Sequence, residues 1–511
     1  MARRVPLIAA CVALVPALLV LGPILMTALH GGGLTGLRGS DLQALWFTLW
    51  QAAASALISC VLAVPLARAL ARRRFIGRSV LITALGAPFI LPVIAAILGL
   101  LAVFGRSGLL NQALGALGLP TMAIYGAHGV ILAHVFFNLP LATRMVLQGW
   151  QAIPAERLRL AMMLDFDGPA RRRHIETPML RATLPGAFIA IFLVCLGSFA
   201  VALTLGGGPS ATTVELAIYQ AFRFDYDTGR AASLALVQVA LCVLAVGIGA
   251  KISAPTGFGA GLDRPTLYGP SSLWQRSGDA AIIVLAALFL LLPIGLILWR
   301  GLPAFPALPL MVWKAAATSL TIALGSTVLA LALALPLALA APRHRWAEGS
   351  AMLPLAASGL VLGTGLFLLI QPFAAPTSLL VPVTLVVNAT LSLPFITRLL
   401  LPEIQSLQAD YDRLATSLDL SGWAKLRRLT LPRLARPLGF SAGLACAFSM
   451  GDLGVITLFS DGQTRTLPLA IFQLMGSYRL DQAAAAATLL LTLTFGLFAL
   501  FDRIGHHADP R

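Results

Sequence analysis

Long apolar runs separated by short polar stretches dominate this chain of 511 residues. Twelve of the runs reach about 20 residues, the length at which a helix crosses a hydrocarbon layer of ~30 Å. Lipid offers no hydrogen-bond partners, so the backbone of each run must bond within itself, which predicts helices. The predicted membrane helices span residues 5–29, 45–67, 79–104, 125–143, 183–205, 231–250, 280–299, 318–341, 350–371, 378–397, 438–459 and 482–501.

Composition agrees with an all-α polytopic membrane protein. Hydrophobic residues make up 58% of the chain and charged residues only 11%, whereas a soluble domain carries about 25% charged residues. A single soluble core is therefore excluded. All five cysteines lie within apolar runs and none has the spacing of a metal-binding pair, so no metal site is predicted.

The net charge of +16 follows from membrane topology. When Lys and Arg are assigned to alternate loops, 28 fall on the side of the N-terminus and eight on the other side. The positive-inside rule then places both termini in the cytoplasm. Because the basic residues are distributed by topology, nucleic acid is not expected as a partner.

One polar signature occurs twice in the chain, at a separation of 254 residues. The matched pairs are Pro140 with Pro394, Ala161 with Ala415, Asp165 with Asp419, Gly168 with Gly422, and Pro178 with Pro432. Earlier in each half, Thr48 matches Ser319 and Pro65 matches Pro336 at a separation of 271 residues. Each half holds six predicted helices, an even number, so the sequence predicts two parallel repeats that enter the membrane in the same direction.

These repeats divide the chain into three parts. The first repeat covers residues 1–252, a cytoplasmic linker rich in Gly, Pro and Ser covers 253–277, and the second repeat covers 278–511. Each repeat contains a polar cytoplasmic stretch, at about 153–181 in the first and about 404–436 in the second. We call these two stretches the docking segments.

Each docking segment is predicted to contain a short amphipathic helix followed by a turn. The apolar positions are Leu158, Ala161 and Met162 in the first segment, and Leu407, Tyr411, Leu414 and Leu418 in the second. An amphipathic helix held at the membrane surface suits insertion into a groove of a partner protein. The alternative is an interfacial helix lying among lipid headgroups. Duplication at a fixed spacing favours docking.

The docking segments resemble the cytoplasmic motif E-A-A-x3-G-x9-I-x-L-P of the permease subunits of bacterial ABC importers. Arg159-Leu160-Ala161 and Arg413-Leu414-Ala415 occupy its E-A-A positions. Asp165 and Asp419 stand where the motif has glycine, and aspartate tolerates a left-handed backbone better than most residues. Within that family the chain is similar to the fused thiamine importer permeases, through residues 132–140, 205–220, 224–227 and 449–454.

The resemblance implies the type I ABC importer permease fold in a bacterial inner membrane. It also implies two copies of a cytoplasmic ATPase, which would bind ATP and Mg, and a periplasmic binding protein that delivers thiamine or its phosphates. The sequence contains no G-x4-G-K-[ST] phosphate loop, so no nucleotide site and no catalytic residue are predicted on this chain. The residues predicted to couple to the ATPase are Leu158, Ala161, Met162, Asp165, Gly168, Pro178, Tyr411, Leu414, Ala415, Leu418, Asp419, Gly422 and Pro432.

Two alternative functions stay open at this point. One is a related fused permease for ferric iron or another small solute. The other is a secondary transporter driven by ions, in which Asp452 would be a proton site. Dependence on an added ATPase, together with insensitivity to protonophores, would separate an ABC permease from the second alternative.

Asp452 is the only formally charged side chain within the twelve predicted helices. A carboxylate is costly in lipid, so this side chain should face the protein interior or an aqueous cavity. We hypothesise that it lines the transport pathway and attracts a cation such as the thiazolium of thiamine; a purely structural partner is the alternative. Ser198 is its matched position, and the polar residues His134, Asn138 and Asn388 either line the same pathway or form hydrogen bonds between helices.

One further charged group falls in a predicted outer loop. Asp225 and Asp227 are accompanied there by Arg223 and Arg230. These residues either contact a binding protein or form a solvated loop, which is the ordinary role of such a run of charges.

Overall fold

A computed structural model describes residues 4–31, 37–86, 90–164, 166, 168–252, 273–460, 462 and 464–507. Within these ranges the regular structure is entirely helical, which confirms the predicted all-α class. Eleven helices in this part of the chain are long and apolar enough to cross a membrane. A twelfth span is obtained when the pair Arg345–Ala356 and Gly359–Ile370, bent by 92°, is counted as one. Most of the predicted linker lies outside the described residues.

The elements of the first half follow the predicted order. They are α1 (Arg4–His30), α2 (Gly39–Arg72), α3 (Arg78–Ala84), α4 (Val93–Phe104), α5 (Leu109–Ala116), α6 (Ala127–Gln151), α7 (Ala155–Met163), α8 (Gly168–Arg171), η3 (Arg172–Glu176), α9 (Thr177–Leu196), α10 (Phe199–Leu205), η4 (Pro209–Ala211), α11 (Val214–Arg223) and α12 (Thr228–Ile252).

The second half begins with a long helix that is described from Leu273. Its elements are α13 (Leu273–Ala304), η5 (Phe305–Ala307), α14 (Leu310–Ala340), α15 (Arg345–Met352), η6 (Leu353–Ala356), α16 (Gly359–Ile370), η7 (Pro376–Leu379), α17 (Leu380–Ser417), α18 (Gly422–Lys425), η8 (Leu426–Thr430), α19 (Leu431–Arg433), α20 (Ala435–Gly451), α21 (Gly454–Phe459), α22 (Leu467–Gly476) and α23 (Leu480–His507).

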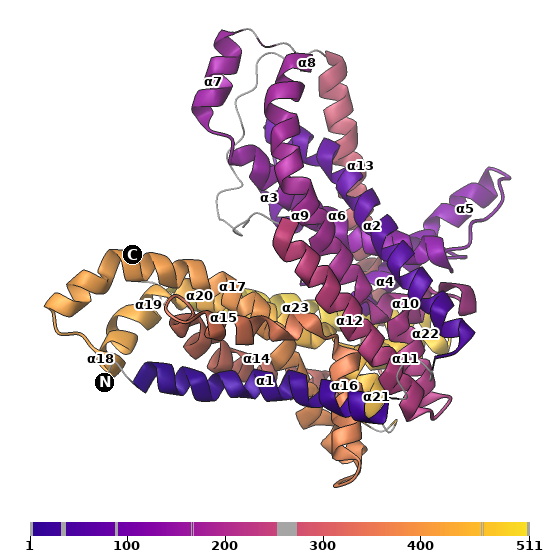
Figure 1. The fold of residues 1–511 in the computed structure, drawn as a ribbon. Helices are drawn as coiled ribbons and strands as arrows, with labels where there is room; N and C mark the ends of the chain where they lie inside the picture. Colours follow the sequence, from indigo (N-terminus) through magenta and orange to yellow (C-terminus); the bar gives the residue numbers. More distant parts are fainter. Residues whose placement is uncertain are drawn as a thin grey trace.

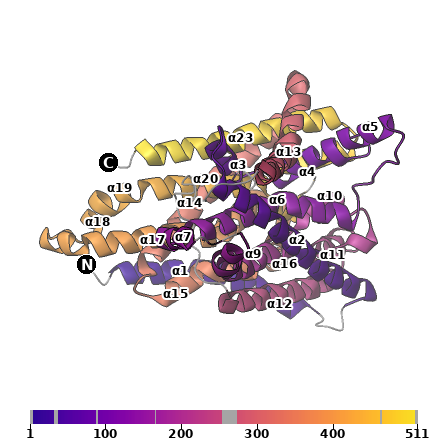
Figure 2. The ribbon, with the colours of Figure 1, turned by 90° about the horizontal axis from the view of Figure 1, so that it is seen from above.

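Two arms diverge from a shared end and give the molecule the outline of a V (Figure 1). The first arm contains α2, α6, α9 and α13, and the second contains α1, α14, α17, α20 and α23. The shared end is built from the shorter helices α4, α10, α11, α16, α21 and α22. Figure 2 views α9 and α13 end-on while α17 and α23 lie across the picture, so the arms point in different directions.

The first helix of each half packs against the other half. Helix α1 contacts α14, α15 and α16, whereas α13 contacts α2 and α4. Glycine permits the two closest approaches, since a Cβ on Gly99 would collide with the backbone of Pro293, and a Cβ on Gly365 with the backbone of Pro23. These two exchanged helices join the arms.

Four of the predicted membrane helices are interrupted, which corrects the prediction that each is continuous. The interruptions lie between α3 and α4, at Gly197-Ser198 between α9 and α10, at Ala357-Ser358 before α16, and at Asp452-Leu453 between α20 and α21. They meet in pairs at the shared end. A Cβ built on Gly197 would lie 4.0 Å from Ser358 Cβ, and one on Gly451 would lie 3.3 Å from Pro92 Cα.

Two hydroxyl groups fix the short outer helices α11 and α22 in the same way. The first backbone N–H of α11, at Val214, donates to Thr48 Oγ1 of α2 at 2.9 Å. The first N–H of α22, at Leu467, donates to Ser319 Oγ of α14 at 2.8 Å. Each hydroxyl satisfies a helix N-terminus that has no intrahelical partner. The pair Thr48 and Ser319, matched in sequence, therefore makes matched contacts.

Candidate functional site

The docking segments lie at the tips of different arms. Helices α7 and α8 form the tip of the first arm, and α18 and α19 form the tip of the second (Figure 1). Helix α1 begins and α23 ends near the second tip. The interrupted helices lie at the opposite, shared end, so the molecule separates two candidate sites: the arm tips, and the crossing where the halves meet.

A single proline makes the two docking segments different. Helix α6 ends at Gln151 and α7 begins at Ala155, with Pro154 between them. Proline disfavours helical backbone at the residue before it and supplies no N–H. The matched position is Gln408, where α17 continues for 38 residues to Ser417. The first docking helix is therefore a separate element, and the second is the end of a long membrane helix.

The turn after the second docking helix has the left-handed residue that the motif suggests. Asp419 has φ +50°, and the N–H of Leu420 donates to the Ala415 oxygen at 2.8 Å, the bond of a Schellman helix end. In the first segment the Phe166 N–H donates to the Ala161 oxygen at 2.9 Å, which is the matched bond. Asp165 lies outside the described residues. Gly422 has φ +55°, and Gly168 is the first residue of α8.

Each docking segment then contains one turn of π-helix at the same relative place. The turns are η3 (Arg172–Glu176) and η8 (Leu426–Thr430). Each is followed by an N–H that bonds five residues back, and then by Pro178 or Pro432, which has no N–H to donate. A proline at this point removes one ladder bond, and the wider turn absorbs the change in register.

Buried and exposed apolar residues divide the docking helices into two faces. Leu158, Ala161 and Ala415 are buried, so these predicted coupling residues pack against their own arm. The exposed apolar side chains are Leu160, Met163 and Leu164 in the first segment and Leu414, Leu418 and Trp423 in the second. Sequence reasoning missed Leu160, Met163, Leu164 and Trp423. The side chain of Met162 lies outside the described part of the chain.

A cation–π contact holds the predicted coupling residue Tyr411 in place. The guanidinium carbon of Arg433 lies 5.0 Å from the centroid of the Tyr411 ring, within the range of a cation–π interaction. Tyr411 is half-buried. It therefore ties the end of α17 to the region after the π-helical turn.

Ion pairs connect the first docking segment to α2. The buried carboxylate of Glu176 forms ion pairs with the guanidinium groups of Arg68, at 3.0 Å, and Arg72, at 3.3 Å. Sequence reasoning did not identify Glu176, because the matched residue in the second segment is Thr430. In the second segment, Asp412 forms ion pairs with Lys425 and Arg343 instead. Each tip is thus fastened to its arm by different residues.

Asp452 lies in an interruption and not within a continuous helix, which corrects the prediction of its position. It follows the last residue of α20, and its Oδ1 accepts the N–H of Gly454 at 3.1 Å. Its Oδ2 is buried and accepts no hydrogen bond from any residue that the structure describes. The space next to Gly454 is bounded by Phe199 and Leu360. The carboxylate therefore lies where the interruptions of both halves meet.

Asn388 belongs to a polar cluster just before Asp452. Its Nδ2 donates to Ser449 Oγ at 3.1 Å, and Ser326 Oγ lies 2.8 Å from the same hydroxyl. Three helices, α14, α17 and α20, supply these residues. Asn388 is thus bonded to Ser449, which lies three residues before Asp452, and its side chain also interacts with the Asp452 carboxylate.

The polar residues predicted in the first half do not form the same cluster. Asn138 Nδ2 donates to the His134 oxygen at 2.8 Å and lies 3.4 Å from Cys195 Sγ. Both ring nitrogens of His134 are buried and without a hydrogen bond among the described residues. Ser198 is the N-cap of α10 and is half-buried. The two halves therefore present different chemistry to the crossing.

Glu215 is a buried carboxyl group that sequence reasoning missed, because it lies outside the predicted helices. It belongs to the first turn of α11, and its side chain bonds with Ser358 of the other half. Burial raises the pKa of Glu215 to about 7, and the bond with Ser358 opposes that shift.

In the described residues no group of three His, Cys, Asp or Glu side chains could hold a metal ion.

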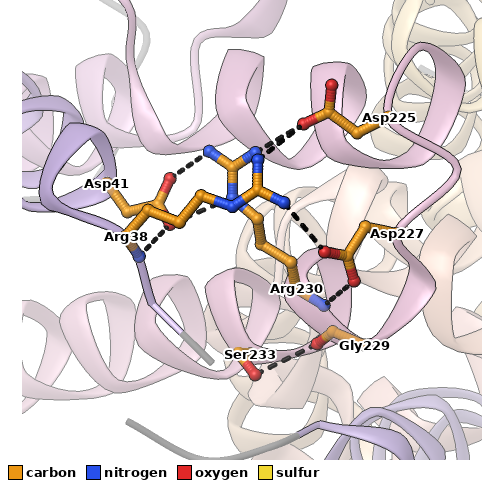
Figure 3. A network of polar contacts seen from close by, with 7 residues as sticks. All are labelled: Arg38, Asp41, Asp225, Asp227, Gly229, Arg230 and Ser233. Atoms are coloured by element: carbon orange, nitrogen blue, oxygen red, sulfur yellow. Dashed lines mark hydrogen bonds and ion pairs between the residues drawn. The ribbon is translucent and has the colours of Figure 1, made fainter. Parts of the chain in front are cut away.

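Three of the four predicted outer charges, Asp225, Asp227 and Arg230, form a compact network with residues at the start of α2 (Figure 3). Arg230 is buried and pairs with Asp41 and with Asp225, the latter at 2.6 Å. Arg38 pairs with Asp227 at 3.2 Å and Asp225 at 3.5 Å. These charges fix the loop between α11 and α12 to the start of α2, so they do not form a freely solvated run.

Known proteins resemble this chain over nearly its whole length. It is 40% identical over 477 residues to the thiamine transport system permease protein ThiP of Salmonella typhimurium, covering 90% of this chain and 89% of that protein. The corresponding protein of Brucella abortus is 38% identical over 500 residues, covering 94% and 92%. That of Haemophilus influenzae is 32% identical over 505 residues, covering 92% of each. No protein-family model matches the chain.

Proposed function

The chain belongs to the family of thiamine transport system permease proteins, and we propose that it is the transmembrane subunit of an ATP-driven importer. It moves thiamine, or its phosphates, from the periplasm to the cytoplasm of a bacterial cell. The observation that carries this proposal is the 40% identity to such a permease over 90% of the chain. The many apolar helices of membrane-crossing length suit the role.

The partner subunits of this importer are two copies of a cytoplasmic ATPase and a periplasmic solute-binding protein. Two features support ATPase docking: the docking segments lie at two separate tips, and each tip exposes apolar side chains such as Leu164 and Leu418. ATP and Mg bind the ATPase. The permease itself moves a solute and catalyses no covalent step.

The chain is organised as two parallel six-helix repeats, 1–252 and 278–511, joined by a cytoplasmic linker. Matching element bounds support this: α6 and α7 together cover the same relative positions as α17, and η3 matches η8 at a separation of 254 residues. The excess of Lys and Arg on one side supports cytoplasmic termini in the inner membrane.

Transport proceeds by alternating access. The arms are spread at the docking tips and joined at the crossing, an arrangement that suits a state open toward the cytoplasm. Closing of the ATPase pair would bring the tips together and separate the contacts at Gly197 and Gly451. Asp452, Ser198, His134, Asn138 and Asn388 are proposed to line the pathway, with Asp452 attracting the thiazolium cation.

Reconstitution in proteoliposomes tests this function. The chain, its ATPase and its binding protein are combined, and ATP hydrolysis is measured with binding protein loaded with thiamine or with ferric ion. Stimulation by the thiamine-loaded form, without sensitivity to a protonophore, is expected. Stimulation by the ferric-loaded form alone would reject thiamine as the substrate, and uptake driven by a proton gradient without ATPase would reject the ABC mechanism.

A further inference from the structure

The two docking segments are connected to their arms in different ways. In the first segment Pro154 separates α7 from α6, and the chain then passes through the short elements α8 and η3 before it reaches α9. The second docking helix is the last part of α17, a single helix over Leu380–Ser417. A continuous helix transmits a displacement along its length, whereas separate short elements need contacts between side chains to do so.

Side-chain contacts lead from α7 to the π-helical turn η3. The N–H of Phe166 donates to the Ala161 oxygen of α7 at 2.9 Å, so Phe166 belongs to the end of the docking helix. The centroid of its ring lies 5.8 Å from that of the His174 ring, within the range of an aromatic contact. His174 lies in η3, and Glu176 is the last residue of that turn. The end of α7 is therefore packed on the turn that carries Glu176.

Glu176 continues this series of contacts to α2. Its Oε2 pairs with Arg68 at 3.0 Å and its Oε1 with Arg72 at 3.3 Å. The two arginines are four residues apart, so they lie on the same face of α2. The Glu176 side chain is 5% exposed, and those of Arg68 and Arg72 are 19% and 10% exposed. Solvent ions therefore screen these ion pairs much less than pairs at an open surface.

A further ion pair connects the same end of α2 to the second half of the chain. Arg73, the residue after α2, pairs with Asp279 of α13 at 2.7 Å. Helix α13 is the exchanged helix that lies in the first arm beside α2 (Figure 1). A displacement of this end of α2 is therefore shared with α13. The contacts from α7 through η3 and α2 to α13 form one connected series.

The second half lacks the charges of this series. The residues that match Glu176, Arg68 and Arg72 are Thr430, Leu339 and Arg343. The Thr430 hydroxyl donates to a backbone oxygen of its own segment, and the Arg343 side chain is 69% exposed. A buried ion pair adds little net stability compared with apolar residues of similar volume. Because the second half forms the same π-helical turn without these charges, stability of the turn does not account for them.

We propose that Glu176 is a positioning residue that carries the movement of the first docking tip to α2 and α13, through ion pairs whose place is taken in the second half by the continuous helix α17. This inference rests on the proposed function. It gives unequal roles to two segments that match in sequence. When the ATPase pair closes, the second tip moves α17 directly, and the first tip moves its arm only while Glu176 holds Arg68 and Arg72. Without these ion pairs the ATPase stays bound, but its hydrolysis no longer opens the crossing fully.

A double variant that installs the residues of the second half tests this role. Glu176→Thr with Arg68→Leu removes one charge of each sign, so the net charge of the site is unchanged. The purified variant should unfold near the wild-type temperature and retain the wild-type amount of ATPase. In proteoliposomes with thiamine-loaded binding protein, thiamine uptake per ATP hydrolysed should fall about tenfold, with the half-maximal concentration of binding protein unchanged. Unfolded chains contribute to neither quantity, so a lower folded yield does not change this ratio.

Two further variants show whether the effect belongs to these ion pairs. Arg68→Lys keeps the positive charge beside Glu176 and should keep most of the uptake per ATP. Asp412→Asn is the matched control, because it breaks ion pairs at the second tip, where α17 is continuous. It should leave the uptake per ATP unchanged.

Three results would overturn the proposal. They are an unchanged uptake per ATP in the double variant, a loss of bound ATPase from that variant, which would make the ion pairs part of the docking surface only, and an equal fall in Asp412→Asn. If the wild-type chain takes up no thiamine while ATP is hydrolysed, the proposed function itself fails and the role of Glu176 falls with it. Normal wild-type uptake together with a normal double variant rejects the role of Glu176 alone.

Discussion

Asp452 combines a helix interruption with a carboxylate oxygen that lacks a hydrogen bond in the described residues. One oxygen is occupied by the N–H of Gly454, which starts α21. The other is the oxygen that the proposed function assigns to a cation passing between the two halves. At the scale of single residues, this division allows the structural role of the side chain to be separated from the role of its charge.

Asp452→Asn keeps an oxygen for the Gly454 N–H and removes the negative charge. Attraction between opposite charges at ~4 Å is worth several kcal/mol away from bulk water, so thiamine uptake per ATP hydrolysed should fall about tenfold or more. Uptake into proteoliposomes, over a range of concentrations of loaded binding protein, is the measurement. Unfolding temperature serves as the control, and unchanged uptake would remove Asp452 from the pathway.

Glu215 should make stability depend on pH in a defined direction. Its pKa is raised from 4.5 to about 7, so the folded chain holds a proton that the unfolded chain releases above pH 4.5. Stability is therefore lost as pH rises from 4.5 to 7, by about 3 kcal/mol in total. Glu215→Gln should unfold at the wild-type temperature near pH 4.5 and at a higher temperature at pH 8. An equal difference at both pH values would contradict this.

Residue-scale features were only partly predictable from sequence. The left-handed Asp419 followed from its place in a motif where glycine is usual, because the local turn demands that conformation. Tyr226 and Tyr478 also have a left-handed backbone at the ends of α11 and α22, but tyrosine is not a residue type that signals such a turn. Glu215 was missed because it lies outside the predicted membrane helices, and its hydrogen bond with Ser358 joins two distant parts of the sequence.

At the scale of elements, the exposed faces of the docking helices should bind the ATPase. Leu160→Glu and Leu414→Glu place a charge on a matched pair of exposed apolar positions. A charge in an apolar groove is strongly unfavourable, so each variant should lower the yield of ATPase that co-purifies with the permease about tenfold. Thr416→Glu, on another exposed position of the same helix, is the control.

The same variants distinguish docking from membrane contact. If both glutamate variants retain the wild-type ATPase yield, and instead alter the lipids bound to the purified chain, the segments are interfacial helices. Loss in Leu414→Glu alone would assign binding to the second tip. The matched positions predict loss at both.

The existence of the membrane helices could be predicted, but their interruptions could not. Length and apolarity are local properties, and lipid forces every such run to be helical. The interruptions at Gly197 and Gly451 lie within apolar runs, where composition hardly changes. They lie where the two halves meet, beside Ser358 and Pro92. The separation of α7 from α6 did have a local signal, Pro154.

At the scale of the whole molecule, the exchanged helices α1 and α13 make each arm a mixture of both halves. Their closest approaches depend on Gly99 and Gly365. No periodicity in the sequence indicates which helix crosses to which arm. The V-shaped outline is therefore a property of packing between distant segments, and sequence reasoning reached only the number and order of the helices.

The arrangement also defines what must move. Spread tips and a closed crossing suit a state open toward the cytoplasm. An inward movement of both tips would have to separate Gly197 from Ser358 and Gly451 from Pro92. A covalent bond across the first of these contacts should therefore stop transport without affecting the fold.

The most direct measurement is thiamine uptake with the contact between residues 197 and 358 cross-linked by a disulfide and then released by reduction. The double variant carries Gly197→Cys and Ser358→Cys. Its two Cβ atoms would lie about 4.0 Å apart, a separation that a disulfide can bridge. The variant is made without the five native cysteines and reconstituted with ATPase and binding protein. Each single-cysteine variant is the control. ATP-dependent uptake should be absent after oxidation and return to the same vesicles after reduction. Full uptake in the oxidised, cross-linked sample would contradict alternating access through this crossing.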